Sequence, residues 1–167
     1  MNDIVDLERA GAGEKAPLRL WLRLFGTSNL IAGEIGARLR ARHAISVAQF
    51  DYLAQLHRSG GADVAMSELG RRLMVTSGNV TGLTDRLERQ GWVRRERAPH
   101  DRRTQFVRLT ADGRARFEAI AAEHRQWILE LTGGLDPEAR RVLFALLGQL
   151  RQSVLEGAAR KTPEAAA

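Results

Sequence analysis

The stretch Met66–Thr110 constrains the fold of this chain more than any other, because two helical patterns are followed by two strand-like ones. The helical segments are short and are joined by a turn at Met74–Thr76. The strand-like segments, Val93–Arg97 and Gln105–Leu109, flank a loop that contains Pro99. The order of helix, turn, helix and basic hairpin predicts a winged helix-turn-helix.

The second helical segment has one apolar and one polar face. Val80, Leu83 and Leu87 recur at helical spacing and predict a buried face. The opposite face carries Gly78 and Gly82, and each exposed glycine costs a helix roughly 1 kcal/mol relative to alanine. That cost is explained if the face must approach another surface closely. For the segment taken alone, an ordinary amphipathic helix with a solvated polar side is the alternative.

The hairpin that follows is strongly basic. Eight arginines lie between Arg86 and Arg108, and only Glu88, Glu96 and Asp101 oppose them. Like charges at this density repel one another unless a polyanion neutralises them, and DNA phosphates do so with release of counterions. A solvated loop would explain the arginines by themselves, but next to a helix-turn-helix the pattern favours DNA binding.

Several submotifs of this stretch, in this order and spacing, resemble the DNA-binding core of the MarR family of bacterial transcription regulators. They are Glu68–Leu73, Ser77–Thr81, Leu83, Asp85–Glu88, Gly91, Asp101–Arg103 and Val107–Thr110. The likeness extends more loosely over residues 18–155. We therefore expect a mainly α fold with a small β wing, in which N- and C-terminal dimerisation helices flank a winged helix-turn-helix core.

Candidate DNA contacts combine this resemblance with side-chain chemistry. Short polar and basic side chains hydrogen-bond base edges and phosphates in a major groove. The family pattern places an acidic residue two positions before an arginine that enters the minor groove, which here implies Asp101 and Arg103. Arg94, Arg95 and Arg97 are expected to contact phosphates or to pair with acidic neighbours. The candidate DNA-binding residues are Thr76, Ser77, Gly78, Asn79, Thr81, Gly82, Arg86, Arg95, Arg97, Asp101, Arg102 and Arg103.

Long apolar helical patterns lie on both sides of this core, over about residues 17–42 and 111–156. Their apolar stripes exceed what the core could cover, so we expect a homodimer. In the resembling family the first and last helices intertwine across a twofold axis. Two recognition helices related by a twofold must lie about 34 Å apart to enter successive major grooves, so the operator should be an imperfect palindrome with half-site centres about 10 bp apart.

Capping residues set the remaining boundaries. Ser46, Thr110 and Asp136 are predicted N-caps, and the helix after Ser46 is expected over Val47–Arg58. Its expected inward-facing residues are Phe50, Leu53, Ala54 and His57. The predicted division is a flexible segment at 1–16, a MarR-type domain at 17–156 with its winged helix-turn-helix at about 46–110, and a disordered tail at 157–167.

Two modes of action remain open from the sequence. In the first, a repressor releases its operator when an effector binds between the dimer helices and the winged core. The resemblance suggests a small aromatic carboxylate, a phenolic compound or its acyl thioester as effector. The second mode is an effector-independent protein that occupies or remodels promoters, and each candidate aromatic could then simply be a core residue. The candidate ligand-binding residues are Trp21, Phe25, Ser28, Asn29, Phe50, His57, His124 and Trp127.

Composition argues against other classes of function. The net charge of +6 favours a polyanionic partner, and the absence of cysteine excludes disulfides and thiol-based redox sensing. The four histidines are scattered without metal-ligand spacing, and no nucleophile elbow or phosphate loop is present, so we expect no metal, no cofactor and no enzymatic activity. The sequence has neither a membrane-spanning apolar run nor a signal peptide, which predicts a cytoplasmic protein without membrane contact.

Overall fold

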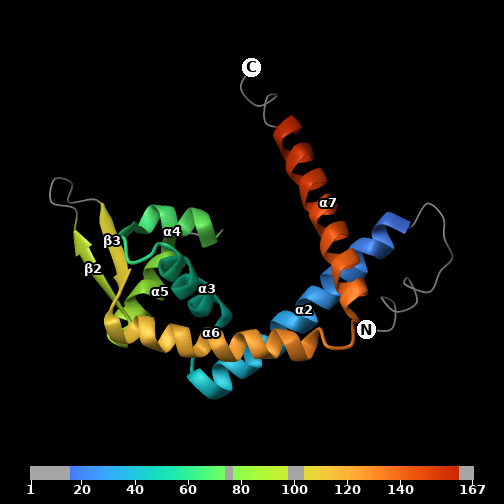
Figure 1. Cartoon of the computed structure of the whole chain (residues 1–167). Coiled ribbons are helices and arrows are strands. Elements are labelled where there is room, and N and C mark those ends of the chain that lie inside the picture. Colours follow the sequence, from blue (N-terminus) through green and yellow to red (C-terminus); the bar gives the residue numbers. More distant parts are fainter. Residues whose placement is uncertain (1–15, 74–76, 98–103, 162–167) are drawn as a thin grey trace. The chain divides into compact units, whose positions relative to one another are not determined.

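The computed structural model describes residues 16–73, 77–97 and 104–161 of the 167-residue chain. It is mainly helical with a small antiparallel sheet, which confirms the fold class that the sequence predicts (Figure 1). The chain forms two compact units, residues 1–127 and residues 128–167. The elements are α2 (Ala16–His43), α3 (Val47–Arg58), β1 (Val64–Ala65), α4 (Met66–Leu73), α5 (Ser77–Arg89), β2 (Val93–Arg97), β3 (Gln105–Leu109), α6 (Ala111–Leu131) and α7 (Pro137–Lys161).

The wing is a sheet in which the described residues form three antiparallel strands, in the order β1, β3, β2. The predicted strands β2 and β3 are confirmed at both ends, and Arg97 pairs with Gln105 next to the wing tip. Strand β1 was not expected from the sequence. It contains two residues and therefore carries no periodic pattern, and it forms only because Val64 pairs with Val107 far along the chain.

The predicted helix caps are confirmed. Ser46 and Gln49 form a capping box, in which each side chain accepts a hydrogen bond from the other residue's backbone N–H at 3.1 and 3.0 Å. Thr110 Oγ1 accepts a hydrogen bond from the Gly113 backbone N–H at 2.9 Å, and Asp136 Oδ1 accepts one from a backbone N–H three residues later at 2.7 Å. These caps fix where α3, α6 and α7 begin.

The predicted inward face of α3 is wrong in part. Leu53 is buried as expected, but Phe50, Ala54 and His57 are only half-buried. The fully buried stripe is rotated from the predicted one because α4, α5 and β3 all pack against it. Its members are Gln49, Tyr52, Leu53 and Leu56.

The hydrophobic core of the first unit lies where α3, α4, α5 and the sheet meet. Leu69 of α4, Leu87 of α5 and Val107 of β3 are fully buried there, and Leu39 contributes from α2. Each such side chain stabilises the fold by roughly 1.5–3 kcal/mol through apolar burial. This core holds α5 against the sheet.

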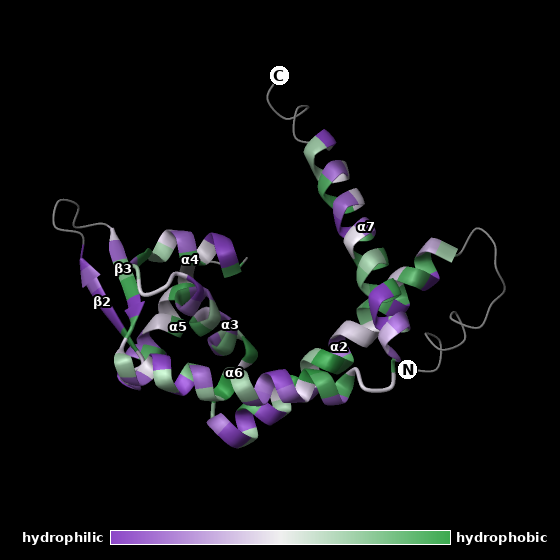
Figure 2. Ribbon diagram, viewed as in Figure 1, coloured by the Kyte–Doolittle hydropathy of each residue, from purple (hydrophilic) through white to green (hydrophobic). Residues whose placement is uncertain are grey.

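Helices α2 and α7 each leave large apolar side chains in solvent. Hydrophobic residues recur along both helices, as the colouring of Figure 2 shows. Apolar faces of this extent mark interaction surfaces in proteins that are not embedded in a membrane. The exposed residues of α2 are Leu18, Leu20, Trp21, Leu24, Phe25 and Leu30. Those of α7 are Val142, Leu143, Phe144, Leu146, Leu147, Leu150, Val154 and Leu155.

The C-terminal boundary differs from the expected one. Helix α7 continues to Lys161, so residues 157–161, which the sequence assigns to a disordered tail, are helical. Ala158, Ala159 and Arg160 are strong helix formers and outweigh the single Gly157. Residues 1–15 and 162–167 of the predicted terminal segments lie outside the described residues. Among the described helices, none is long and apolar enough to cross a membrane.

Candidate nucleic-acid interface

Helix α5, the predicted recognition helix, divides into a core face and a solvent face. Val80, Thr84 and Leu87 are buried, and Leu83 is half-buried. A Cβ atom added to Gly82 would meet nothing within 4 Å, so the helix backbone is open to the outside there. The exposed residues of α5 are Asn79, Thr81, Gly82, Asp85, Arg86, Glu88 and Arg89. The polar face therefore points outward, as the sequence indicates.

A buried hydrogen bond holds α5 to α3. The Tyr52 hydroxyl lies 2.6 Å from Thr84 Oγ1, and both residues are 0% exposed. Thr84 Oγ1 also donates to the Val80 carbonyl oxygen at 2.8 Å. Because a threonine hydroxyl carries a single proton, Tyr52 must be the donor to Thr84. Burial raises the pKa of Tyr52 to about 12.

Because of this raised pKa, we expect the protein to lose stability at alkaline pH. Tyr52 is the only tyrosine of the chain, so the absorbance of tyrosinate reports its ionisation alone. The folded pKa lies above the ordinary value of 10.0, so Tyr52 contributes stability that is complete below pH 10 and is lost as the pH rises towards 12. Tyrosinate absorbance should rise near pH 12 in the folded protein and near pH 10 in urea. The free energy of unfolding should fall by roughly 2–3 kcal/mol over this interval.

The control for this titration is Tyr52→Phe. This variant should show no loss of stability between pH 10 and 12. At neutral pH its free energy of unfolding should be about 1 kcal/mol lower than that of the wild type, because Thr84 loses its buried donor. A tyrosine that titrates near pH 10 in the native protein would contradict the buried hydrogen bond.

Arg95 of the wing is clamped to α5 by two carboxylates. Glu88 accepts hydrogen bonds from the backbone N–H and from Nε of Arg95, both at 3.1 Å, and Asp85 accepts one from Nη2. The hydrogen bond to Asp85 raises the pKa of Arg95 above its usual value. Only 20% of the Arg95 side chain is exposed. Of the two roles that the sequence left open for Arg95, the geometry favours pairing with acidic neighbours, which fixes the wing against the recognition helix.

The other arginines near α5 differ in how far carboxylates compensate them. Arg108 pairs with Glu96 at 2.6 Å and with Asp63 at 3.5 Å, and Arg94 pairs with Glu96 at 3.3 Å. The hydrogen bond from Arg108 lowers the pKa of Glu96, so this carboxylate stays charged. Within the described ranges, the exposed arginines of α5 and β2 without a carboxylate partner are Arg86, Arg89 and Arg97.

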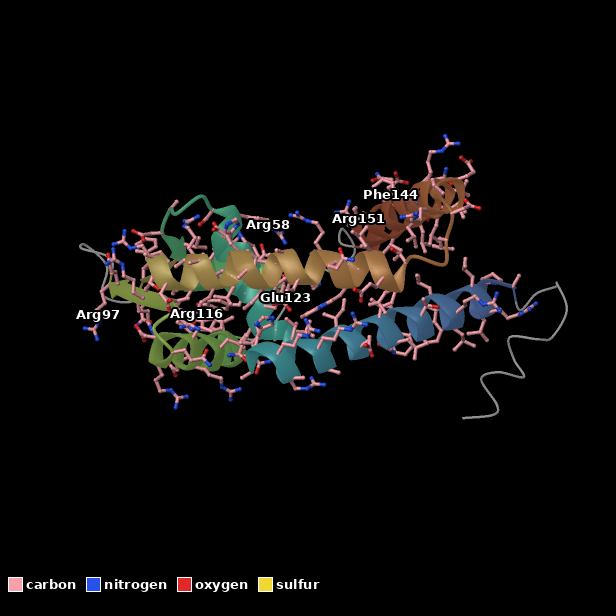
Figure 3. The ribbon with its side chains drawn as sticks, turned by 60° about the horizontal axis from the view of Figure 1, so that its bottom comes forward. Arg58, Arg97, Arg116, Glu123, Phe144 and Arg151 are labelled. Atoms are coloured by element: carbon pink, nitrogen blue, oxygen red, sulfur yellow. The ribbon has the colours of Figure 1, made fainter. Side chains whose placement is uncertain are left out.

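These uncompensated arginines carry the charge that is available to phosphates. Arg97 projects from the end of β2 towards solvent (Figure 3). Arg89 was not among the candidate contacts, although its place on the polar face of the predicted helix could have suggested it. The Arg89 Nε atom donates only to a backbone carbonyl oxygen, that of Asp85, at 3.3 Å.

The end of α5 is joined tightly to α6. Gly91, with a φ of 75°, and Trp92 close α5 with a Schellman motif, in which the Trp92 N–H donates to the Leu87 carbonyl at 3.0 Å. Thr110 then donates to the Trp92 carbonyl through its N–H at 3.0 Å. A Cβ atom on Gly113 would lie 1.8 Å from the same carbonyl oxygen, so the first turn of α6 packs directly on the Trp92 backbone.

Some predicted DNA contacts cannot be placed. Thr76, Asp101, Arg102 and Arg103 lie outside the described residues. Ser77 and Gly78 form the first turn of α5, and only their backbone is described. The candidate contacts that the structure does place are Asn79, Thr81, Gly82 and Arg86 on α5 and Arg95 and Arg97 on β2.

Half of the predicted ligand-binding residues gather between α3 and α6. The rings of Phe50 and His124 are 4.6 Å apart, and the rings of His124 and Trp127 are 6.3 Å apart. His57 lies 4.9 Å from the Phe117 ring and 3.2 Å from a Glu118 oxygen. Burial lowers the pKa of His124, which favours its neutral form.

The other four predicted ligand-binding residues lie on α2, away from these rings. Trp21 and Phe25 stack with their centroids 5.4 Å apart, and Ser28 and Asn29 follow one turn later, all exposed. Helix α2 contacts the Trp127 ring of α6 near its C-terminal end. The Cζ atoms of Arg38 and Arg42 each lie 5.9 Å from the centroid of that ring, and the His43 ring lies 6.2 Å from it. At about 1.5 Å per residue, Phe25 is about 20 Å along the helix from Arg38, the nearest of these residues. One chain therefore does not bring the two groups into one pocket.

Comparison with known proteins gives consistent matches. A model of the MarR family matches residues 45–104. The chain is 31% identical over 120 residues to YdgJ of Bacillus subtilis, an uncharacterized HTH-type transcriptional regulator, with 72% of each chain covered. It is 30% identical over 116 residues to the HTH-type transcriptional regulator PecS of Dickeya dadantii, which covers 69% of this chain and 70% of PecS.

Solved structures agree with these sequence matches. A MarR family transcriptional regulator from Streptomyces coelicolor in complex with DNA has a TM-score of 0.75 at 25% identity, covering 93% of this chain and 97% of that one. A mutant MarR from E. coli complexed with operator DNA has a TM-score of 0.69 at 27% identity, covering 83% of this chain and 99% of that one.

Proposed function

The chain belongs to the MarR family of DNA-binding transcriptional regulators, and we propose that it acts as a homodimeric repressor that a small aromatic ligand releases from a palindromic operator. Members of this family bind DNA and are not enzymes. The observation that carries the proposal is the outward polar face of α5 beside uncompensated arginines, on a chain whose α2 and α7 leave apolar faces in solvent.

Homodimerisation explains the apolar faces of α2 and α7. A second copy of the chain would remove from water the side chains that one copy leaves exposed. It would also place two α5 helices on one duplex, and the proposed separation of about 34 Å matches one turn of DNA. Operator DNA is then bound by two modest interfaces at once, which gives high affinity and explains a palindromic site.

We propose that side chains of this protein contact DNA in both the major and the minor groove. Asn79, Thr81 and Arg86 would reach base edges or phosphates in the major groove, and Gly82 would permit close approach of the helix. Arg89 and Arg97 would neutralise phosphates. The wing arginines Arg102 and Arg103, with Asp101 and the first-turn residues Thr76, Ser77 and Gly78, remain proposed contacts on sequence grounds.

The proposed effector site is the ring cluster between α3 and α6, where Phe50, His57, His124 and Trp127 meet. Flat apolar rings beside a histidine suit an aromatic acid or a phenol. Trp21, Phe25, Ser28 and Asn29 would then line a surface between copies. A ligand that binds the two arrangements of the dimer unequally shifts the spacing of the recognition helices and so releases the operator.

Operator release tests the regulatory part of the proposal. Randomised duplexes selected with the full-length protein would give the operator, and fluorescence anisotropy would follow its release across a panel of aromatic carboxylates and phenols. At least one compound should weaken binding at least tenfold. If every compound leaves operator affinity unchanged, the protein acts without an effector and instead occupies or remodels promoters.

Replacement of Arg103 by alanine tests the wing. Loss of one minor-groove guanidinium should cost roughly 1–3 kcal/mol of operator affinity, while the secondary structure and the oligomeric state stay unchanged. Arg125→Ala on the exposed surface of α6 is the matched control and should bind as the wild type does. Equal affinity of Arg103→Ala and wild type, measured at one salt concentration, would remove Arg103 from the interface.

A further inference from the structure

The exposed apolar side chains of α7 lie on more than one side of the helix. Leu143 and Leu150 belong to a broad stripe that suits the proposed homodimer. Phe144 and Leu155, which are 82% and 49% exposed, lie about 100° to 140° around the helix from both of these leucines. They form a second apolar surface, which that stripe does not include.

Two arginines border this second surface. Arg140 lies about one turn before Phe144 on the same side of α7, and Arg151 lies about two turns after it (Figure 3). Both arginines are exposed, and among the residues that the structure describes neither pairs with a carboxylate. The neighbouring Arg141 differs, because Glu138 accepts hydrogen bonds from it at 2.7 Å. The second surface is therefore both apolar and positively charged.

A glycine lies in the middle of this surface. A Cβ atom added to Gly148 would meet nothing within 4 Å, so the helix backbone is open to solvent there. A glycine inside a helix costs roughly 1 kcal/mol relative to alanine. That cost is explained if another chain packs closely against α7 at this point. We call this surface the Phe144 face, and its members are Arg140, Phe144, Gly148, Arg151 and Leu155.

The chemistry of the Phe144 face specifies what can cover it. Arg140 and Arg151 are about 16 Å apart along the helix, so their partner must carry two carboxylates at a similar separation. Apolar side chains must lie between these carboxylates to remove Phe144 and Leu155 from water. An amphipathic helix with an acidic residue at each end of a short apolar stripe meets both conditions. DNA phosphates would neutralise the arginines but would leave the apolar side chains uncovered.

We propose that the Phe144 face is a docking site for an acidic amphipathic helix of a partner protein. The two carboxylates of that helix would pair with Arg140 and Arg151. Its apolar side chains would cover Phe144 and Leu155, and Gly148 would let the two helices approach closely. The face shares no residue with α5 or with the wing, so docking is a property separate from operator binding.

The test uses a designed helical peptide as probe. It is built from alanine and glutamine, carries two glutamates with the spacing of Arg140 and Arg151, and has two leucines between them on the same side. Titrated into the isotope-labelled full-length protein without DNA, it should shift the amide resonance of Gly148 and leave that of Gly82 on α5 unchanged. A peptide with glutamine in place of both glutamates should bind about fivefold more weakly, because two exposed ion pairs are lost.

Variants of α7 identify the surface that the peptide uses. Phe144→Ser should weaken binding of the glutamate peptide about tenfold, because the largest apolar contact is lost. The double variant Arg140→Glu, Arg151→Glu should reverse the preference and bind a peptide with two lysines better than the glutamate peptide. Arg160→Glu is the matched control and should bind as the wild type does, since nine residues from Arg151 place Arg160 on the opposite side of α7.

The inference is overturned if the glutamate peptide does not bind, if the glutamine peptide binds equally well, or if Phe144→Ser binds as the control does. Two further results would assign the face to another occupant and overturn it as well. Residues 1–8 carry Asp3, Asp6 and Glu8 and no basic side chain. If their deletion tightens peptide binding tenfold, this segment of the chain itself competes for the face. If Phe144→Ser makes the protein monomeric in sedimentation, a second copy covers the face.

Discussion

Gly113→Ala should lower the free energy of unfolding by about 3 kcal/mol, the upper end of the cost of overpacking a core. The added Cβ atom would lie 1.8 Å from the carbonyl oxygen of Trp92, 2.6 Å from its carbonyl carbon and 2.8 Å from its Cα. All three are backbone atoms, so no rotamer change relieves the clash. Either α6 must move away from Trp92 or the end of α5 must shift. Urea denaturation measures the loss of stability directly.

Gly82→Ala is the opposite case and serves as the control. A Cβ at Gly82 meets nothing within 4 Å, so alanine should raise the free energy of unfolding by roughly 0.5–1 kcal/mol through its better helix propensity. Its operator affinity should nevertheless fall, because the proposed close approach to DNA leaves no room for a methyl group. A Gly113→Ala variant as stable as the wild type would contradict the packing of α6 on Trp92.

The order of elements and most of their boundaries could be predicted because each depends on local chemistry. Strands β2 and β3 follow from alternation and from the turn residues between them. Ser46, Thr110 and Asp136 identify helix starts because a side-chain oxygen satisfies a free backbone N–H wherever it occurs. Such signals lie within four residues of the boundary that they mark.

Features that depend on contacts between distant segments could not be predicted in this way. The short strand β1 exists through pairing with β3, and the buried stripe of α3 is chosen by the elements that surround it. The arginines show the same limit most clearly. Arg95 and Arg97 are two residues apart and alike in sequence, yet two carboxylates of α5 clamp the first, and the second has no carboxylate partner among the described residues.

The candidate ligand-binding residues also differ in how far their positions could be predicted from the sequence. Phe50 and His124 meet because α3 and α6 pack side by side, a contact that an aromatic stripe on each helix could suggest. The separation of Phe25 from that cluster follows from the length of α2, since an unbroken helix of 28 residues keeps its two ends apart.

Introducing glutamate side chains into the apolar stripe of α7 should abolish high-affinity operator binding. Leu143 and Leu150 are 44% and 36% exposed in the single chain, and at seven residues apart they lie on one side of the helix. The double variant Leu143→Glu, Leu150→Glu therefore costs the isolated chain little, whereas a dimer interface would have to bury two carboxylates in each copy. Sedimentation should show a monomer, and operator affinity should fall by about a hundredfold or more, because the second half-site no longer adds to binding.

Phe144→Glu separates this effect from a general loss of hydrophobicity. Phe144 is the most exposed large apolar residue of α7, at 82%, and it shares a side of the helix with Arg151 rather than with Leu143 and Leu150 (Figure 3). It should leave both the dimer and operator binding unchanged. If the double variant stays dimeric, the interface does not use this stripe. If it is monomeric yet binds the operator normally, the spacing of paired recognition helices does not control binding, and regulation through that spacing is excluded.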